Sequence, residues 1–192
     1  MLLIVDPQID FITGSLPVPG AEEAMERLAD YVKRSGDDYD MIAITADRHP
    51  MGHSSFKEAG GRWPVHCVEC SVGAALWPSV LEALYLFSDH VVILYKGQDR
   101  ERDEYSILDS EEGRRILEEH IKGGCNERDS REITAVDICG LAGDVCVAKT
   151  LEDLKSLYPK LEVRVLKRFT ASLDGGERLR DLTRIYGLDV ME

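Results

Sequence analysis

Short apolar runs alternate with amphipathic segments along the whole chain, and this alternation limits the fold more than any other feature of the sequence. The run Val91–Leu94 contains only apolar residues, which is typical of a strand buried on both faces of a sheet. Further upstream, Met25, Leu28 and Val32 recur at helical spacing. Strands that alternate with helices predict an α/β fold, with a parallel sheet flanked by helices on both faces.

The same patterns locate the individual elements. We expect one domain over residues 1–192, because a chain of this length can bury a single substantial core. The predicted strands, about five or six in all, lie at 2–6, 41–46, 91–95, 133–141 and 161–166, with a short one at 188–191. The predicted helices lie at 21–33, 76–87, 110–121, 147–157 and 178–186.

The charge balance excludes two classes of partner. A net charge of −13 argues against nucleic acid and against an anionic membrane surface, since both require a basic face. The five cysteines are too few and too unevenly spaced for a disulfide framework, which favours a reducing compartment. No apolar run approaches the roughly 18–20 residues of a membrane span, and the chain opens directly on a strand, so we expect no secretory signal. These features predict a cytoplasmic protein.

Reactive side chains follow four of the predicted strands. Asp6, Asp47 and Lys96 stand at or just after three strand ends, and the small-residue turn 142–146 follows a fourth. Parallel strands end at one edge of a sheet, where α/β proteins bind their ligands. We therefore expect these groups to meet in one site.

Cys146 is the candidate nucleophile within that turn. It follows an apolar strand and the pair Ala142-Gly143, and a helical pattern begins near Asp144. At the start of a helix, unpaired N–H groups and the helix dipole favour a thiolate. The same N–H groups can stabilise an oxyanion during acyl transfer.

Asp6 and Lys96 each have a functional and an ordinary interpretation. A carboxylate beside a cysteine can accept its proton and later deliver it to a leaving amine. A lysine at a buried edge can hold that carboxylate and lower the pKa of the thiol. Read alone, however, Asp6 is more typical of a helix or turn cap and Lys96 of a solvated loop.

A long irregular segment carries three histidines and an aspartate. Asp47 and His49 are two residues apart, so in an extended segment they project to the same side, and His66 could complete the set. Such ligands suit zinc, iron or manganese, with His53 as a fourth ligand or as a partner of a metal-bound water. The alternative is a histidine cluster without metal.

Other residues of this segment have weaker assignments. Cys67 and Cys70 form an isolated C-x-x-C, which lacks the second pair of a structural zinc site; a redox pair is an alternative to a packed loop. Trp63, together with Phe11, is a candidate to enclose a flat ring, although either is more often ordinary core.

Five segments occur in a set order along the chain. They are Ile4–Phe11, Thr45–Pro50, Trp63–Cys67, Tyr95–Gly97 and Cys139–Val147. Together they resemble the isochorismatase-like cysteine hydrolase superfamily and, within it, the nicotinamidase branch.

The resemblance implies an activity and a set of site residues. The activity is hydrolysis of nicotinamide to nicotinate and ammonia through a cysteine thioester, with one divalent metal ion, zinc ahead of iron or manganese, that positions the pyridine ring. The implied residues are the catalytic triad Asp6, Lys96 and Cys146; the metal ligands Asp47, His49 and His66, with His53 at a position that ligates metal in some relatives; Phe11, Trp63 and Tyr105 around the substrate; and an oxyanion hole from the backbone of Ala142 and Cys146. A cis peptide between Leu141 and Ala142 is implied as well.

Two other functions stay open, and so does the exact amide preference. One is another amidase of the superfamily, acting on a carbamoyl or ureido compound, although such relatives generally lack the metal set. The other is a non-catalytic metal-binding relative, against which the intact triad argues. Gly143 stands where the family often has Thr, and the loop 98–104 is unusually charged. The expected partners are a small-molecule amide and, as is common in the family, further copies of the chain.

Overall fold

A parallel sheet of six strands runs through the centre of the computed structural model, which describes residues 1–122 and 132–191. Its strands are β1 Leu2–Val5, β2 Ile42–Asp47, β3 Val91–Lys96, β4 Ala135–Gly140, β5 Glu162–Thr170 and β6 Asp189–Met191. The order is β3-β2-β1-β4-β5-β6, and every neighbouring pair is parallel. The predicted α/β class is confirmed.

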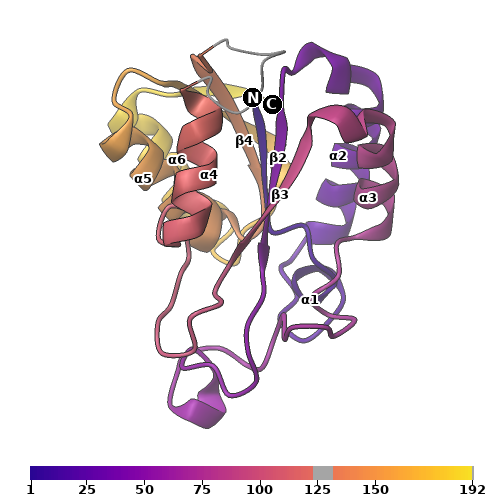
Figure 1. Ribbon diagram of the computed structural model, residues 1–192, viewed down its shortest axis with the longest axis vertical. Helices are drawn as coiled ribbons and strands as arrows, with labels where there is room; N and C mark the ends of the chain where they lie inside the picture. Colours follow the sequence, from indigo (N-terminus) through magenta and orange to yellow (C-terminus); the bar gives the residue numbers. More distant parts are fainter. Residues whose placement is uncertain (123–131, 192) are drawn as a thin grey trace.

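Helices cover both faces of this sheet (Figure 1). On one face lie α2 Ala21–Ser35 and α3 Pro78–Leu84; on the other lie α4 Glu111–Ile121, α5 Ala148–Leu157 and α6 Glu177–Tyr186. Side chains of β1 alternate between the two layers, because successive strand residues point to opposite faces: Leu2 and Ile4 join one core cluster, and Leu3 and Val5 join the other.

Shorter helical pieces connect the main elements. They are α1 Ile9–Ile12, the 3₁₀ helices η1 Gly36–Asp38, η2 Lys57–Ala59 and η3 Tyr85–His90, and the π-helical turn η4 Gly143–Val147. The helix predicted at 76–87 begins two residues later than expected, because Pro78 stands in the first turn of α3, and after Leu84 it continues as the 3₁₀ helix η3. The four residues of α1 are too few to produce a periodic signal in the sequence.

The expectation that β3 is buried on both faces is wrong. Leu94 and Lys96 are buried, but Ile93 and Tyr95 on the opposite face are 37% and 41% exposed. The reason is that β3 is an edge strand of the sheet, a position that its own composition does not reveal.

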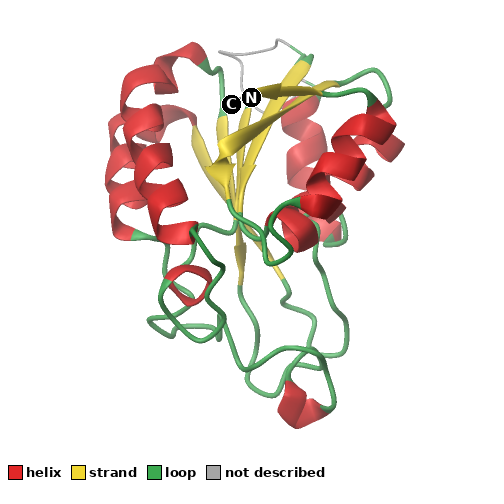
Figure 2. Cartoon of the chain, turned by 180° about the vertical axis from the view of Figure 1, so that it is seen from behind, coloured by secondary structure: helices red, strands yellow, loops and turns green. Residues whose placement is uncertain are grey.

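Long connections extend beyond the carboxyl ends of the strands, at the end of the molecule away from both termini (Figures 1 and 2). The two longest described ones are 48–77, which follows β2, and 97–110, which follows β3. They enclose the candidate site. In the described part of the chain, no helix has the length and apolar character needed to cross a membrane.

Candidate active site

Three reactive side chains meet at the carboxyl edge of the sheet. Asp6 follows β1, Lys96 ends β3, and Cys146 lies in η4 just after β4. The Lys96 Nζ lies 2.8 Å from Asp6 Oδ2 and 3.6 Å from Cys146 Sγ. All three side chains are buried. The parallel sheet thus brings together the three residues expected to form a triad.

Local hydrogen bonds hold Asp6 in this place. Its backbone has a positive φ of 48°, a conformation that aspartate tolerates better than most residues and that turns the chain sharply at the end of β1. Thr45, on the neighbouring strand, donates its hydroxyl to Asp6 Oδ1 at 2.6 Å. The second carboxylate oxygen is left to face Lys96.

Burial governs the protonation states of the cluster. It raises the pKa of Cys146 well above the ordinary value for a thiol, and the Lys96 ammonium opposes this only in part. Burial also raises the pKa of Asp6, again against the effect of Lys96. Burial alone would lower the pKa of Lys96, but Asp47 and Asp6 hold it well above its usual range.

Burial therefore opposes the thiolate that the start of a helix and the Lys96 charge favour. The Cys146 thiol lies near the Asp6 carboxylate, with the sulfur and a carboxylate oxygen within 4.8 Å of each other. Removal of the sulfur from water raises the pKa of the thiol by more than the Lys96 ammonium lowers it. Such a thiol needs a base at the moment of attack, and Asp6 is placed to be that base.

A second group of side chains lies beside the triad. Asp47 ends β2, and ligand atoms of Asp47, His49 and His66 all lie within 4.8 Å of one another. The His49 Nδ1 contacts the Gly97 carbonyl at 2.9 Å, and the His66 Nδ1 contacts the Pro64 carbonyl at 2.7 Å. These bonds leave each Nε2 for a metal, the usual arrangement of histidine ligands. Gly97 permits the approach, because a Cβ there would lie 2.4 Å from the His49 ring.

The charges of this group also suit a divalent cation. Asp47 and Asp6 are two buried carboxylates, and both pair with Lys96, whose Nζ lies 2.6 Å from Asp47 Oδ1. Burial would raise the pKa of Asp47, but Lys96 and His49 together hold it below its usual range. Asp6, Asp47 and Cys146 likewise converge, but there the Lys96 ammonium already supplies the positive charge. The group Asp47, His49 and His66 is thus the fitting metal site.

His53 does not belong to the converging group that the described residues form. Its Nδ1 lies 2.7 Å from the Ser55 hydroxyl, and its Nε2 lies 3.1 Å from the Arg102 carbonyl. Its ring packs on that of His49, with centroids 4.3 Å apart. His53 therefore supports His49 and ties it to the charged loop.

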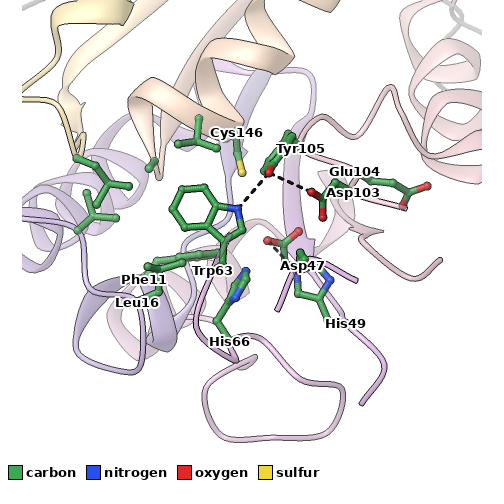
Figure 3. A pocket seen from close by; sticks show the side chains of 15 residues that line it. Phe11, Leu16, Asp47, His49, Trp63, His66, Asp103, Glu104, Tyr105 and Cys146 are labelled. Carbon is green, nitrogen blue, oxygen red and sulfur yellow. Dashed lines mark hydrogen bonds and ion pairs between the residues drawn. The ribbon is translucent and has the colours of Figure 1, made fainter. Parts of the chain in front are cut away.

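Aromatic side chains form the walls of the pocket between the two groups (Figure 3). Phe11, Trp63 and Tyr105 line a space of about 460 Å³, counting its open mouth, and Cys146 faces the same space. The Trp63 indole N–H donates to the Tyr105 hydroxyl at 3.1 Å, and that hydroxyl donates to Asp103 at 3.2 Å. The three residues expected to surround a flat ring thus lie together.

The turn that carries the nucleophile has the implied backbone geometry. The Leu141–Ala142 peptide is cis, and Ala142 and Cys146 both line the pocket. Gly143 donates its N–H to the Ala171 carbonyl at 2.7 Å. A Cβ at Gly143 would lie 2.2 Å from the Ser172 Oγ, so the departure from threonine has a steric reason in this chain.

Sequence reasoning missed some residues of the site and left others without a role. Gln8 is fully buried and bonds the backbone of Asp47, and Asp103 and Glu104 line the pocket. A polar side chain next to a strand end was the available signal for Gln8. Cys67 is buried and Cys70 exposed, and both are free thiols.

Comparison with known proteins agrees with this geometry. Residues 1–187 match the Isochorismatase domain family. The nicotinamidase/pyrazinamidase of Mycobacterium tuberculosis is 31% identical over 180 residues, which cover 90% of this chain and 86% of that protein. The pyrazinamidase of Pyrococcus horikoshii in complex with zinc is 27% identical, with a TM-score of 0.79 and coverage of 100% and 97%. The yeast nicotinamidase bound to the inhibitor nicotinaldehyde is 25% identical, with a TM-score of 0.81 and coverage of 100% and 98%.

Proposed function

This chain belongs to the isochorismatase family, and we propose that it is an amidohydrolase that converts nicotinamide and water to nicotinate and ammonia. One observation carries the proposal. Cys146 lines the same aromatic pocket as Asp47, His49 and His66, and the buried Asp6 and Lys96 lie next to its sulfur outside the lining. A nucleophile beside a base suits amide cleavage, and histidines beside a carboxylate suit the metal that a pyridine nitrogen can bind.

In the first half of the reaction, Asp6 accepts the Cys146 proton and the sulfur attacks the carboxamide carbon. Lys96 keeps Asp6 oriented and offsets the negative charge that develops on the sulfur. The backbone N–H groups of Ala142 and Cys146 stabilise the oxyanion. Asp6 then returns its proton to the departing ammonia, which leaves a nicotinoyl thioester on Cys146.

In the second half, Asp6 takes a proton from a water molecule, which attacks the thioester carbonyl. The carbon–sulfur bond breaks, nicotinate leaves, and the proton restores the Cys146 thiol. The net change is one water consumed and one ammonia released, and the enzyme returns to its starting state.

We propose that Asp47, His49 and His66 would hold one divalent ion. Zinc is the first candidate, because the similar pyrazinamidase of Pyrococcus horikoshii was solved in complex with zinc. When bound, this ion supplies a Lewis-acidic position for the pyridine nitrogen. Phe11, Trp63 and Tyr105 would hold the ring in plane and exclude water from it. Pyrazinamide, which has the same shape and a ring nitrogen, should be hydrolysed as well.

Cleavage of a carbamoyl or ureido compound is the alternative, and the metal group argues against it. Such substrates have no ring nitrogen that would need Asp47, His49 and His66. The triad argues against a non-catalytic role. Burial of Lys96 with two carboxylates costs stability, and buried charged clusters of this kind are typical of catalytic sites. A single domain over residues 1–192, a cytoplasmic location and homo-oligomers stay predictions. We also propose a role in NAD salvage.

The direct test is ammonia release from nicotinamide, assayed beside two amides without a pyridine ring, together with the metal content of the protein. We expect Cys146→Ser to abolish turnover while the circular dichroism spectrum is unchanged, and a chelator to weaken turnover strongly. Cys70→Ser is the matched control. Cys70 is an exposed thiol, so we expect this variant to keep full activity. Faster release from the non-pyridine amides would contradict the proposed substrate, and an active Cys146→Ser would contradict the nucleophile.

A further inference from the structure

The segment from the end of β1 into α1 carries two polar side chains that the mechanism does not use. Gln8 is fully buried, and Asp10 is half-buried two residues further on. They lie between the catalytic base Asp6 and the pocket residue Phe11. Both reach across to the segments that carry the metal group.

Gln8 holds the backbone of Asp47 from both sides. The Asp47 N–H donates to Gln8 Oε1 at 2.7 Å, and Gln8 Nε2 donates to the Asp47 carbonyl at 2.8 Å. The second N–H of the same amide donates to the Ala74 carbonyl at 2.9 Å. This geometry fixes both peptide groups of Asp47 and so sets where its side chain starts, while Lys96 holds the carboxylate itself.

Asp10 holds the segment that carries the other two ligands. Its Oδ2 accepts the N–H of Cys67 at 2.7 Å, and Cys67 directly follows His66. The Cys67 carbonyl in turn accepts the N–H of His49 at 2.9 Å. Asp10 Oδ1 accepts the N–H of Ser15 at 3.0 Å, which anchors the carboxylate at its other end. One side chain therefore positions the backbones of both histidines.

We propose that Gln8 and Asp10 are positioning residues that fix the metal group relative to the catalytic Asp6 and Cys146. This inference rests on the proposed function of Asp47, His49 and His66 as metal ligands. Apart from the bond between Asp10 and Ser15, these hydrogen bonds go from one short segment, which starts at the catalytic base, to the end of β2 and to the loop 48–77, which carry the ligands. The segment thus sets the distance between the metal, where the ring would be held, and the sulfur, where the carboxamide must be.

The test measures zinc binding directly, with Zn²⁺ alone, by competition with a chromophoric chelator on metal-stripped protein. Gln8→Met keeps the length of the side chain but can make none of the three hydrogen bonds. Loss of a group that orients metal ligands commonly weakens metal affinity by about 10–100-fold, and we expect Gln8→Met to fall in this range. With nicotinamide we expect KM to rise more than kcat falls. The rate of alkylation of Cys146 should stay within about twofold of the wild type, since the triad is intact.

Two further variants keep the test decisive if Gln8→Met folds poorly. Gln8→Glu retains an acceptor for the Asp47 N–H but cannot donate to either carbonyl, and should also weaken zinc binding at least tenfold. Asp10→Asn can accept only one of its two backbone donors, and should weaken zinc binding about tenfold or less. The control is Ser110→Ala, which removes the N-cap of α4 at a residue that does not line the pocket and should lower stability without a change in zinc affinity.

The outcomes separate this inference from the proposed function. Zinc affinities within about threefold of the wild type in all the Gln8 and Asp10 variants, with lower thermal stability as the only change, would show a merely structural role. Wild-type protein that binds zinc but does not hydrolyse nicotinamide would refute the proposed substrate and leave this inference in place.

Discussion

Replacement of Lys96 by methionine tests the electrostatic account of the site most directly. Lys96 is fully buried, and its ammonium lies 2.8 Å from Asp6 and 2.6 Å from Asp47. Methionine has nearly the same length but no charge, so Lys96→Met leaves two neighbouring carboxylates buried without a cation. Removal of one partner from a buried ion pair costs about 3–5 kcal/mol of unfolding free energy.

The size of this loss depends on pH, because the folded variant can relieve it by protonation of one carboxylate. Protonation of a group with an ordinary pKa of about 3.9 costs about 1.4 kcal/mol for each pH unit above that value. Protonation therefore limits the loss of unfolding free energy to about 5.6 kcal/mol at pH 8 but to only about 1.5 kcal/mol at pH 5. The pKa of Asp6 is already raised in the wild type, so the sign is clear: the penalty is absent below the unfolded pKa and grows as pH rises.

The assay is urea unfolding of chelator-treated protein, followed by circular dichroism at pH 8 and at pH 5. We expect Lys96→Met to lose about 3–5 kcal/mol at pH 8 and about 1–2 kcal/mol at pH 5. The control is Lys149→Met on α5, whose pair with Asp153 is partly exposed and should contribute about 0.5 kcal/mol at both pH values. A loss below about 1 kcal/mol at pH 8, or equal losses at the two pH values, would refute the reasoning.

Three further predictions address the base, the pocket and the turn. Because ionised Asp6 accepts the thiol proton and its pKa is raised, kcat/KM should fall on acidification with a midpoint above pH ~3.9, and a lower midpoint would contradict this role. Tyr105→Phe removes the acceptor of the Trp63 N–H, a loss of about 1 kcal/mol that should raise KM up to about tenfold, whereas an unchanged KM would exclude a part in ring binding. Gly143→Thr should lower the unfolding free energy, measured by urea unfolding, by about 1–3 kcal/mol, because the new side chain clashes with Ser172. The additional change Ser172→Gly should restore part of this loss, and no restoration would rule out the clash as its cause.

The sequence alone was sufficient for the architecture and for most of the site. Apolar runs and helical periodicity are local properties, and they were enough to predict a parallel α/β sheet. Parallel strands must end at a common edge, so Asp6, Asp47 and Lys96 could be expected to meet without knowledge of the strand order. The resemblance added the roles of these residues and of Cys146.

What only the tertiary structure decided depends on contacts between distant residues. Lys96 bridges both carboxylates, and Gln8 holds Asp47 from 39 positions away. Both contacts follow from strand order and loop packing, which the periodicity of the sequence does not encode. The raised pKa of the Cys146 thiol has the same origin. The sequence shows a cysteine before a helix, but the depth of its burial, which outweighs the neighbouring positive charge, exists only in the folded chain.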